Sequence, residues 1–106
     1  MKRSEVWWVN FDPSVGGEIQ KQRPVVIVSN DAANQFLNRV QVVPLTGSTD
    51  RLYPSEAYVT LKGKRSKAMA DQLTTVSKHR LINKAGSLSS ADMQGIARAI
   101  TTQLDL

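Results

Sequence analysis

The hydrophobic positions of this chain fall into short runs separated by polar loops, a pattern that favours a small β-rich domain. Residues 5–11 alternate and are rich in β-forming side chains, so they predict a first strand. Residues 24–29 hold too many consecutive apolar side chains for a half-exposed edge, so we expect a central strand there. Residues 40–45 predict a third strand, in which Pro44 argues for a bulge or a strand end.

The second half predicts further short elements. Residues 57–61 and 67–70 predict a hairpin around the polar stretch 62–66, which ends the run of strand-forming residues. The remaining short segments are a helical turn within 30–38, a strand at 72–76 and an ambiguous stretch at 77–82 that is compatible with a helical turn.

The clearest local pattern is a C-terminal helix that follows residues 84–88. Ser89 is the expected N-cap, with Asp92 three residues on as a variant of the capping box. Apolar residues then recur at helical spacing and predict one face packed on a core. These residues are Met93, Ile96, Ala97, Ile100 and Leu104.

Two adjacent tryptophans mark the first strand. Trp7 and Trp8 must point to opposite sides of it, because successive strand residues alternate between faces. One of them should enter the core, and the other needs a second hydrophobic surface, for which we expect a subunit interface. With several short strands and one terminal helix, residues 1–106 predict a single small domain with a curved sheet or partly open barrel.

Composition narrows the class of protein. The chain has 106 residues, 41% of them hydrophobic, and no apolar run long enough to cross a bilayer. The basic N-terminus has no apolar segment behind it that would form a signal peptide, so we expect a cytoplasmic protein. The absence of cysteine excludes a disulfide framework and Cys-ligated metal sites. The net charge of +5 suits a polyanionic partner such as nucleic acid, although the basic residues are scattered.

The available side chains exclude several chemistries. His79 is the only histidine, so a two-histidine acid/base pair is impossible and a Ser-His-Asp set is unconvincing. No acidic spacing indicates a divalent metal site, and no phosphate-binding loop of the Walker type is present. Arginine, hydroxyl groups and one loop carboxylate remain, and they suffice for RNA cleavage because RNA supplies its own 2′-OH nucleophile.

The candidate centre is Arg23, which follows the glycine-rich loop 12–22 and precedes a proline and an apolar strand. The proline biases Arg23 to an extended conformation, and a guanidinium binds phosphate at two points. A hydroxyl at a neighbouring strand end, Thr46 or Ser48, could hold a phosphate oxygen, and Glu18 could act as a base or fix Arg23. The alternative at each position is plain: a solvated charge at Arg23 and Glu18, and a turn residue at Thr46.

Taken together, five segments resemble the MazF/PemK family, the toxins of type II toxin–antitoxin pairs that act as mRNA interferases. The resemblance covers almost the whole chain and lies in EVWWVNFDP (5–13), GGEIQKQRPVVIVS (16–29), VVPLT (42–46), YP (53–54) and ADQ (70–72), with the C-terminal helix in the same order and spacing. It implies an SH3-like (PemK/CcdB-like) barrel, a homodimer, metal-independent and cofactor-free cleavage of single-stranded RNA, and inhibition by an acidic antitoxin.

The resemblance also implies site residues. Arg23 and Thr46 match the catalytic pair of the MazF branch, and Glu18 occupies a loop position implicated in some members. The PemK branch uses a loop histidine, an arginine and an aspartate, and this chain keeps only the aspartate, so a MazF-like mechanism is expected. Ile19 stands where the family usually has Gln. The RNA-binding residues expected with this site are Lys21, Gln22, Ser48, Arg51, Asp71 and Gln72.

Two other functions remain open at this point. One is a gyrase poison of the related CcdB type, against which the C-terminal sequence QLDL counts because that branch relies on an aromatic residue there. The other is a non-catalytic nucleic-acid-binding barrel, which fits the positive charge equally well. Retention of both Arg23 and Thr46 favours the enzyme.

Overall fold

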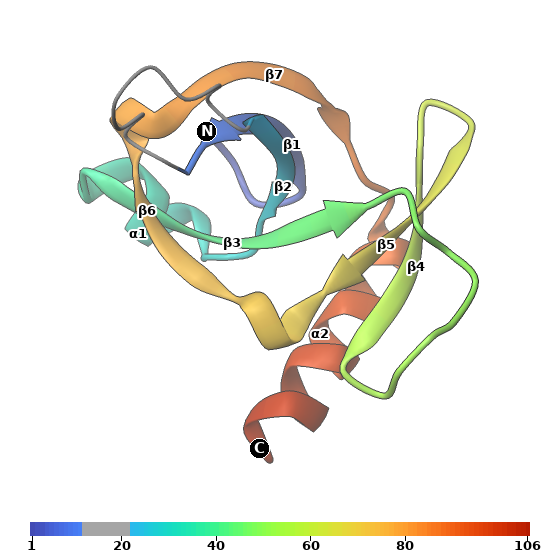
Figure 1. The fold of residues 1–106 in the computed structure, drawn as a ribbon. Helices are drawn as coiled ribbons and strands as arrows, with labels where there is room; N and C mark the ends of the chain where they lie inside the picture. Colours follow the sequence, from blue (N-terminus) through green and yellow to red (C-terminus); the bar gives the residue numbers. More distant parts are fainter. Residues whose placement is uncertain (12–21) are drawn as a thin grey trace, which may run out of the picture.

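The computed structural model describes residues 1–11 and 22–106 of the chain, and the strands of this part form one curled, antiparallel sheet (Figure 1). Their order across the sheet is β4-β5-β3-β2-β1-β7, with β6 paired to β3 beside β5. The elements are β1 (Glu5–Asn10), β2 (Gln22–Ile27), α1 (Asp31–Phe36), β3 (Arg39–Thr46), β4 (Glu56–Leu61), β5 (Lys64–Met69), the 3-10 turn η1 (Ala70–Gln72), β6 (Thr74–Ser77), the 3-10 turn η2 (Lys78–Arg80), β7 (Leu81–Ser87) and α2 (Ser90–Leu104).

The sheet is covered on both faces at β2, which confirms a central strand. Val26 belongs to a core cluster that includes β4, β5 and the buried side of α2, whereas Val25 and Ile27 belong to a second cluster with β6 and β7. A strand with two buried faces needs apolar residues at every position rather than at alternate ones. The unbroken run after Pro24 is therefore the consequence of curling the sheet around two cores.

Pro44 lies inside β3, not at a bulge or a strand end. The amide of Val28 donates to the carbonyl of Gln41 (2.9 Å), so alternation along the register makes Val25 and Pro44 a non-hydrogen-bonded pair. The nitrogen of Pro44 thus points away from β2, toward the opposite side of β3. On that side β6 pairs with β3 only as far as Val42, and β5 pairs with it only from Leu45. The proline is tolerated because no neighbouring strand needs a donor there.

The β4–β5 hairpin is tighter than its polar tip predicts. Leu61 already pairs with Lys64, so only Lys62 and Gly63 form the turn. Both have positive φ angles, 51° and 79°, which is the geometry of a two-residue type I′ turn. The strands therefore extend through part of the stretch 62–66 that the sequence assigned to a loop.

The C-terminal helix begins as predicted, and its buried face differs in detail. The Ser89 hydroxyl accepts from the amide of Asp92 (3.1 Å), but the Asp92 carboxylate accepts from the amide of Thr60 (2.8 Å) and ties the helix to β4. Ala99 is buried in place of Ala97, and Leu104 is half exposed. The stripe ends early because α2 runs past the edge of the sheet (Figure 1).

Two local predictions were wrong. Gln72 lies in the turn η1, and strand β6 starts only at Thr74. Residues 84–88, expected only to lead into the helix, belong mostly to β7, which pairs with β1 through two register shifts. The irregular pairing and the exposed face of β7 explain why its sequence has no clear alternation.

The tryptophans do point to opposite faces. Trp7 packs on the second core cluster and its indole nitrogen donates to the Glu5 carboxylate (3.1 Å), whereas Trp8 keeps 37% of its surface exposed. Burial raises the pKa of Glu5, but hydrogen bonds from the Lys2 amide and the Trp7 indole, together with the Lys84 ammonium, outweigh it and lower the pKa to about 2. Glu5 therefore joins the N-terminus, β1 and β7.

Neither helix in the described ranges is long and apolar enough to cross a membrane.

Candidate active site

Antiparallel pairing brings the start of β2 beside the end of β3. The register pairs Val25 with Pro44, and continued by two residues it sets Arg23 opposite Thr46. This position falls in the non-hydrogen-bonded class, in which facing side chains approach most closely. Two residues far apart in sequence are thereby placed on one face, just beyond the last paired residues of the two strands.

Arg23 is exposed near the start of β2, and Thr46 is half-buried at the end of β3. The Thr46 hydroxyl accepts a hydrogen bond from the amide of Ser48 (3.3 Å), as in a turn that reverses the chain at the strand end. Accepting this bond occupies a lone pair and leaves the hydroxyl proton able to be donated. A guanidinium and a hydroxyl donor on one face can together bind an anionic oxygen.

The loop after Thr46, residues 47–55, is fixed to the sheet by side chains from β4 and β5. The Tyr58 hydroxyl donates to the carbonyl of Thr49 (3.0 Å), and the Lys67 ammonium donates to the carbonyl of Arg51 (2.8 Å). Ser48 and the Arg51 side chain are exposed on this loop. The loop thus presents a hydroxyl and a cation beside the strand end that carries Thr46.

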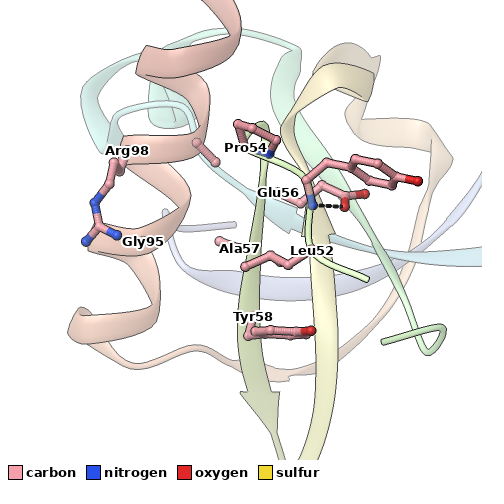
Figure 2. Close-up of a pocket in the computed structure, with 9 residues that line it drawn as sticks. Leu52, Pro54, Glu56, Ala57, Tyr58, Gly95 and Arg98 are labelled. Carbon is pink, nitrogen blue, oxygen red and sulfur yellow. Dashed lines mark hydrogen bonds between the residues drawn. The ribbon is translucent and has the colours of Figure 1, made fainter. Parts of the chain in front are cut away.

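The same loop forms one wall of a hollow of about 420 Å³ against α2. Figure 2 shows Gly95 and Arg98 of α2 on one side, and Leu52, Pro54 and Ala57 on the other. Its lining is largely apolar, with the Arg98 guanidinium exposed at the helix. The shape of this hollow depends on how the loop is held.

The other predicted RNA-binding positions lie at exposed places. Gln22 begins β2, while Asp71 and Gln72 lie in η1, directly after β5. The Gln72 amide contacts the sulfur of Met69 (3.6 Å). Glu18 and Lys21 fall outside the described residues. The functional roles of all these positions stay predictions.

Sequence reasoning did not single out Arg80, which lies at this end of the sheet. Arg80, in η2, donates to the backbone carbonyls of Asn10 (3.2 Å) and Phe11 (2.9 Å). It thereby holds the chain at the end of β1, directly before residue 12. Its position in an ambiguous polar stretch carried no signal, because the contact depends on the packing of η2 against the end of β1.

Among residues 1–11 and 22–106, no three His, Asp or Glu side chains gather as a metal-binding group. Among these described residues, the face beside Thr46 offers the Arg23 guanidinium and a hydroxyl donor.

Comparison with known proteins gives a consistent result. A sequence model of the family described as PemK-like, MazF-like toxin of type II toxin-antitoxin system matches residues 2–104. The chain is 36% identical over 115 residues to Endoribonuclease MazF9 of Mycobacterium tuberculosis, covering 100% of this chain and 98% of that protein. It is 31% identical over 111 residues to Endoribonuclease MazF of Staphylococcus saprophyticus, covering 100% and 92%.

Solved structures agree on the fold. An endoribonuclease from a mycobacterial species, solved in complex with its cognate antitoxin, superposes with a TM-score of 0.82 at 28% identity, covering 100% of this chain and 96% of that one. The curled sheet with its C-terminal helix is therefore the fold expected from the resemblance.

Proposed function

The chain belongs to the family of PemK-like, MazF-like toxins of type II toxin–antitoxin systems and is an endoribonuclease of that family. We propose that it cuts single-stranded mRNA at a site formed by Arg23, Thr46 and Glu18. The observation that supports this proposal is the antiparallel register of β2 and β3, which pairs Val25 with Pro44 and, continued by two residues, would bring Arg23 opposite Thr46. No metal ion or other cofactor takes part in the proposed reaction.

The proposed reaction is an in-line attack by the RNA 2′-OH. The 2′-oxygen bonds to phosphorus and loses its proton to a base, for which Glu18 is the candidate. The bond from phosphorus to the 5′-oxygen breaks, and that oxygen takes up a proton. Arg23 offsets the charge that develops on the phosphoryl oxygens, and Thr46 donates to one of them. The products carry 2′,3′-cyclic phosphate and 5′-OH ends.

The proposed RNA path follows the exposed polar residues around this pair. Ser48 and Arg51 lie on the loop that continues from Thr46, and Gln22 precedes Arg23. Lys21, Asp71 and Gln72 complete the set. Contacts to phosphates position the strand, and loop shape selects the bases.

We further propose an acidic antitoxin as the partner, a two-fold homodimer and a cytoplasmic location. The related mycobacterial endoribonuclease was solved with its cognate antitoxin, which supports a protein inhibitor. The net charge of +5 suits an acidic, disordered segment that folds as it binds. Exposed Trp8 supplies the proposed dimer contact, whereas Trp7, on the opposite face of β1, packs on the second core cluster and supports the strand from behind.

The test is cleavage of an end-labelled single-stranded RNA in excess EDTA, with the matched duplex alongside. We expect cutting of the single strand only, with cyclic phosphate at the new 3′ end. Loss of cutting on chelation that magnesium restores would contradict the mechanism. RNA that is bound but never cut would favour the non-catalytic barrel, and a trapped gyrase–DNA complex would favour the CcdB-like alternative.

A further inference from the structure

Lys67 is the only charged residue that is buried in the described part of the chain, with 7% of its surface exposed. Its ammonium lies 3.1 Å from a carboxylate oxygen of Glu56, and both side chains are 9% exposed. A buried charge is costly unless it is paired and hydrogen-bonded. What these two residues hold in place is therefore informative.

The pair holds the loop that follows Thr46. Lys67 donates to the carbonyl of Arg51 (2.8 Å), and its ammonium lies 5.8 Å from the centre of the Tyr53 ring. The same Glu56 oxygen that faces Lys67 also accepts from the amide of Tyr53 (2.9 Å), the bond drawn as a dashed line in Figure 2. One ion pair thus fixes two backbone points of the loop 47–55.

The ion pair is also next to Thr46 in the sheet. Lys67 is the register partner of Thr46 on one side and of Tyr58 on the other, so the three side chains form a row on one face of β3, β5 and β4. Tyr58 donates to the carbonyl of Thr49 (3.0 Å), and the Arg65 guanidinium stacks on its ring at 3.5 Å. The loop folds back over this row, which begins at Thr46.

Stability is a weak explanation for such a pair. Replacing a buried ion pair with apolar side chains of similar volume is often neutral or stabilising, whereas removing one partner leaves an uncompensated charge. What a buried, directional pair adds is a single geometry. Here that geometry belongs to the carbonyl of Arg51 and to the strand position beside Thr46.

We propose that Lys67, paired with Glu56, is a positioning residue that fixes the loop 47–55 and with it the Thr46 hydroxyl and the Arg51 side chain for RNA cleavage. This inference rests on the proposed function. Lys67 acts through its neighbours and does not contact the substrate.

The experiment compares two variants of the pair. Lys67→Met orphans Glu56, so it loses stability as well as activity. The double variant Lys67→Met/Glu56→Gln removes both charges and regains most of the lost melting temperature. We expect kcat of the double variant to remain on the order of 10- to 100-fold below that of the parental protein, because misplacement of a reacting group by about 1 Å has effects of that size. We expect KM to rise as well, through Arg51.

Two further variants separate positioning from general damage. Lys84→Met breaks the Lys84–Glu5 pair, which has the same 3.1 Å separation but lies away from the loop, and it should leave kcat unchanged. In a Thr46→Val background, Lys67→Met/Glu56→Gln should lower kcat little further, because residues that act as a unit are not additive.

Parental kcat in the stable double variant would overturn the inference, and so would a full additional loss in the Thr46→Val background. Failure of the proposed function looks different. It would appear as parental protein that does not cut RNA, or as Thr46→Val protein that cuts at the parental rate, and either result is read without any Lys67 variant.

Discussion

Acid should loosen the attachment of β1 to β7 through one carboxylate, that of Glu5. Its oxygens accept from the Lys2 amide (3.0 Å) and the Trp7 indole (3.1 Å) and lie 3.1 Å from the Lys84 ammonium. These contacts favour the charged form and lower the pKa from 4.5 to about 2, against the opposing effect of burial. The perturbation of interest is Glu5→Gln, which keeps the shape and removes the charge.

The sign and size follow from linkage. Because the folded pKa is the lower one, the stabilisation is fully present above pH 4.5 and is lost as the pH falls toward 2. A shift of this size corresponds to at most about 3 kcal/mol. Lys84 is 47% exposed, so solvent screens its share, and we expect about 1–2 kcal/mol to be lost on acidification.

The assay is urea denaturation at several pH values between 6 and 2.5, at low salt, with Trp fluorescence as the signal. The parental protein should lose about 1–2 kcal/mol more than Glu5→Gln over this range. Asp50→Asn, which neutralises an exposed carboxylate, is the control and should follow the parental curve. Identical pH dependence of the parental and Glu5→Gln proteins would refute this account of β1.

Three further predictions concern the site, the hairpin and the assembly. Arg23→Ala should reduce cleavage by at least about 100-fold without loss of fold, because one preorganised charge is removed from the developing anion. Arg23→Lys should recover only part of the lost rate, since a point charge cannot replace the two-point contact of a guanidinium. Thr46→Val should lower the rate less than Arg23→Ala does. Cleavage at the parental rate by Arg23→Ala would place the site elsewhere. Gly63→Ala should cost about 1 kcal/mol in chemical denaturation, because its φ of 79° suits glycine, and an unchanged midpoint would argue against the type I′ turn. Trp8→Ser should weaken self-association in sedimentation while the melting temperature stays close to parental, and a parental protein that sediments as a monomer would contradict the dimer.

Local pattern was enough for the elements whose signals are local. The helix from Ser90 was predictable because its N-cap and its apolar spacing both lie within the segment. The central position of β2 was predictable because an unbroken apolar run has no exposed face to offer. Strand β7 was not, since its irregular pairing with β1 leaves no alternation to detect.

The candidate site divides in the same way. The residue types at Arg23 and Thr46, and the family resemblance that singles them out, are properties of the sequence. Their placement opposite each other depends on the register of β2 and β3, which is set by which apolar faces the two cores bury. The burial of Lys67 could not be predicted from the sequence, because a lysine in a β strand is ordinarily exposed to solvent.

The sequence by itself determined a small β-rich chain with a C-terminal helix, a positive charge, and an arginine and a threonine at the ends of two apolar strands. Only the tertiary structure decided that a loop would fold back over β4 and β5 and bury the Lys67–Glu56 pair beside Thr46. The physical reason is that burial and pairing of charges are properties of the packed surface. They arise when strands far apart in sequence are brought into register, and no local pattern of residues encodes which distant strands will pair.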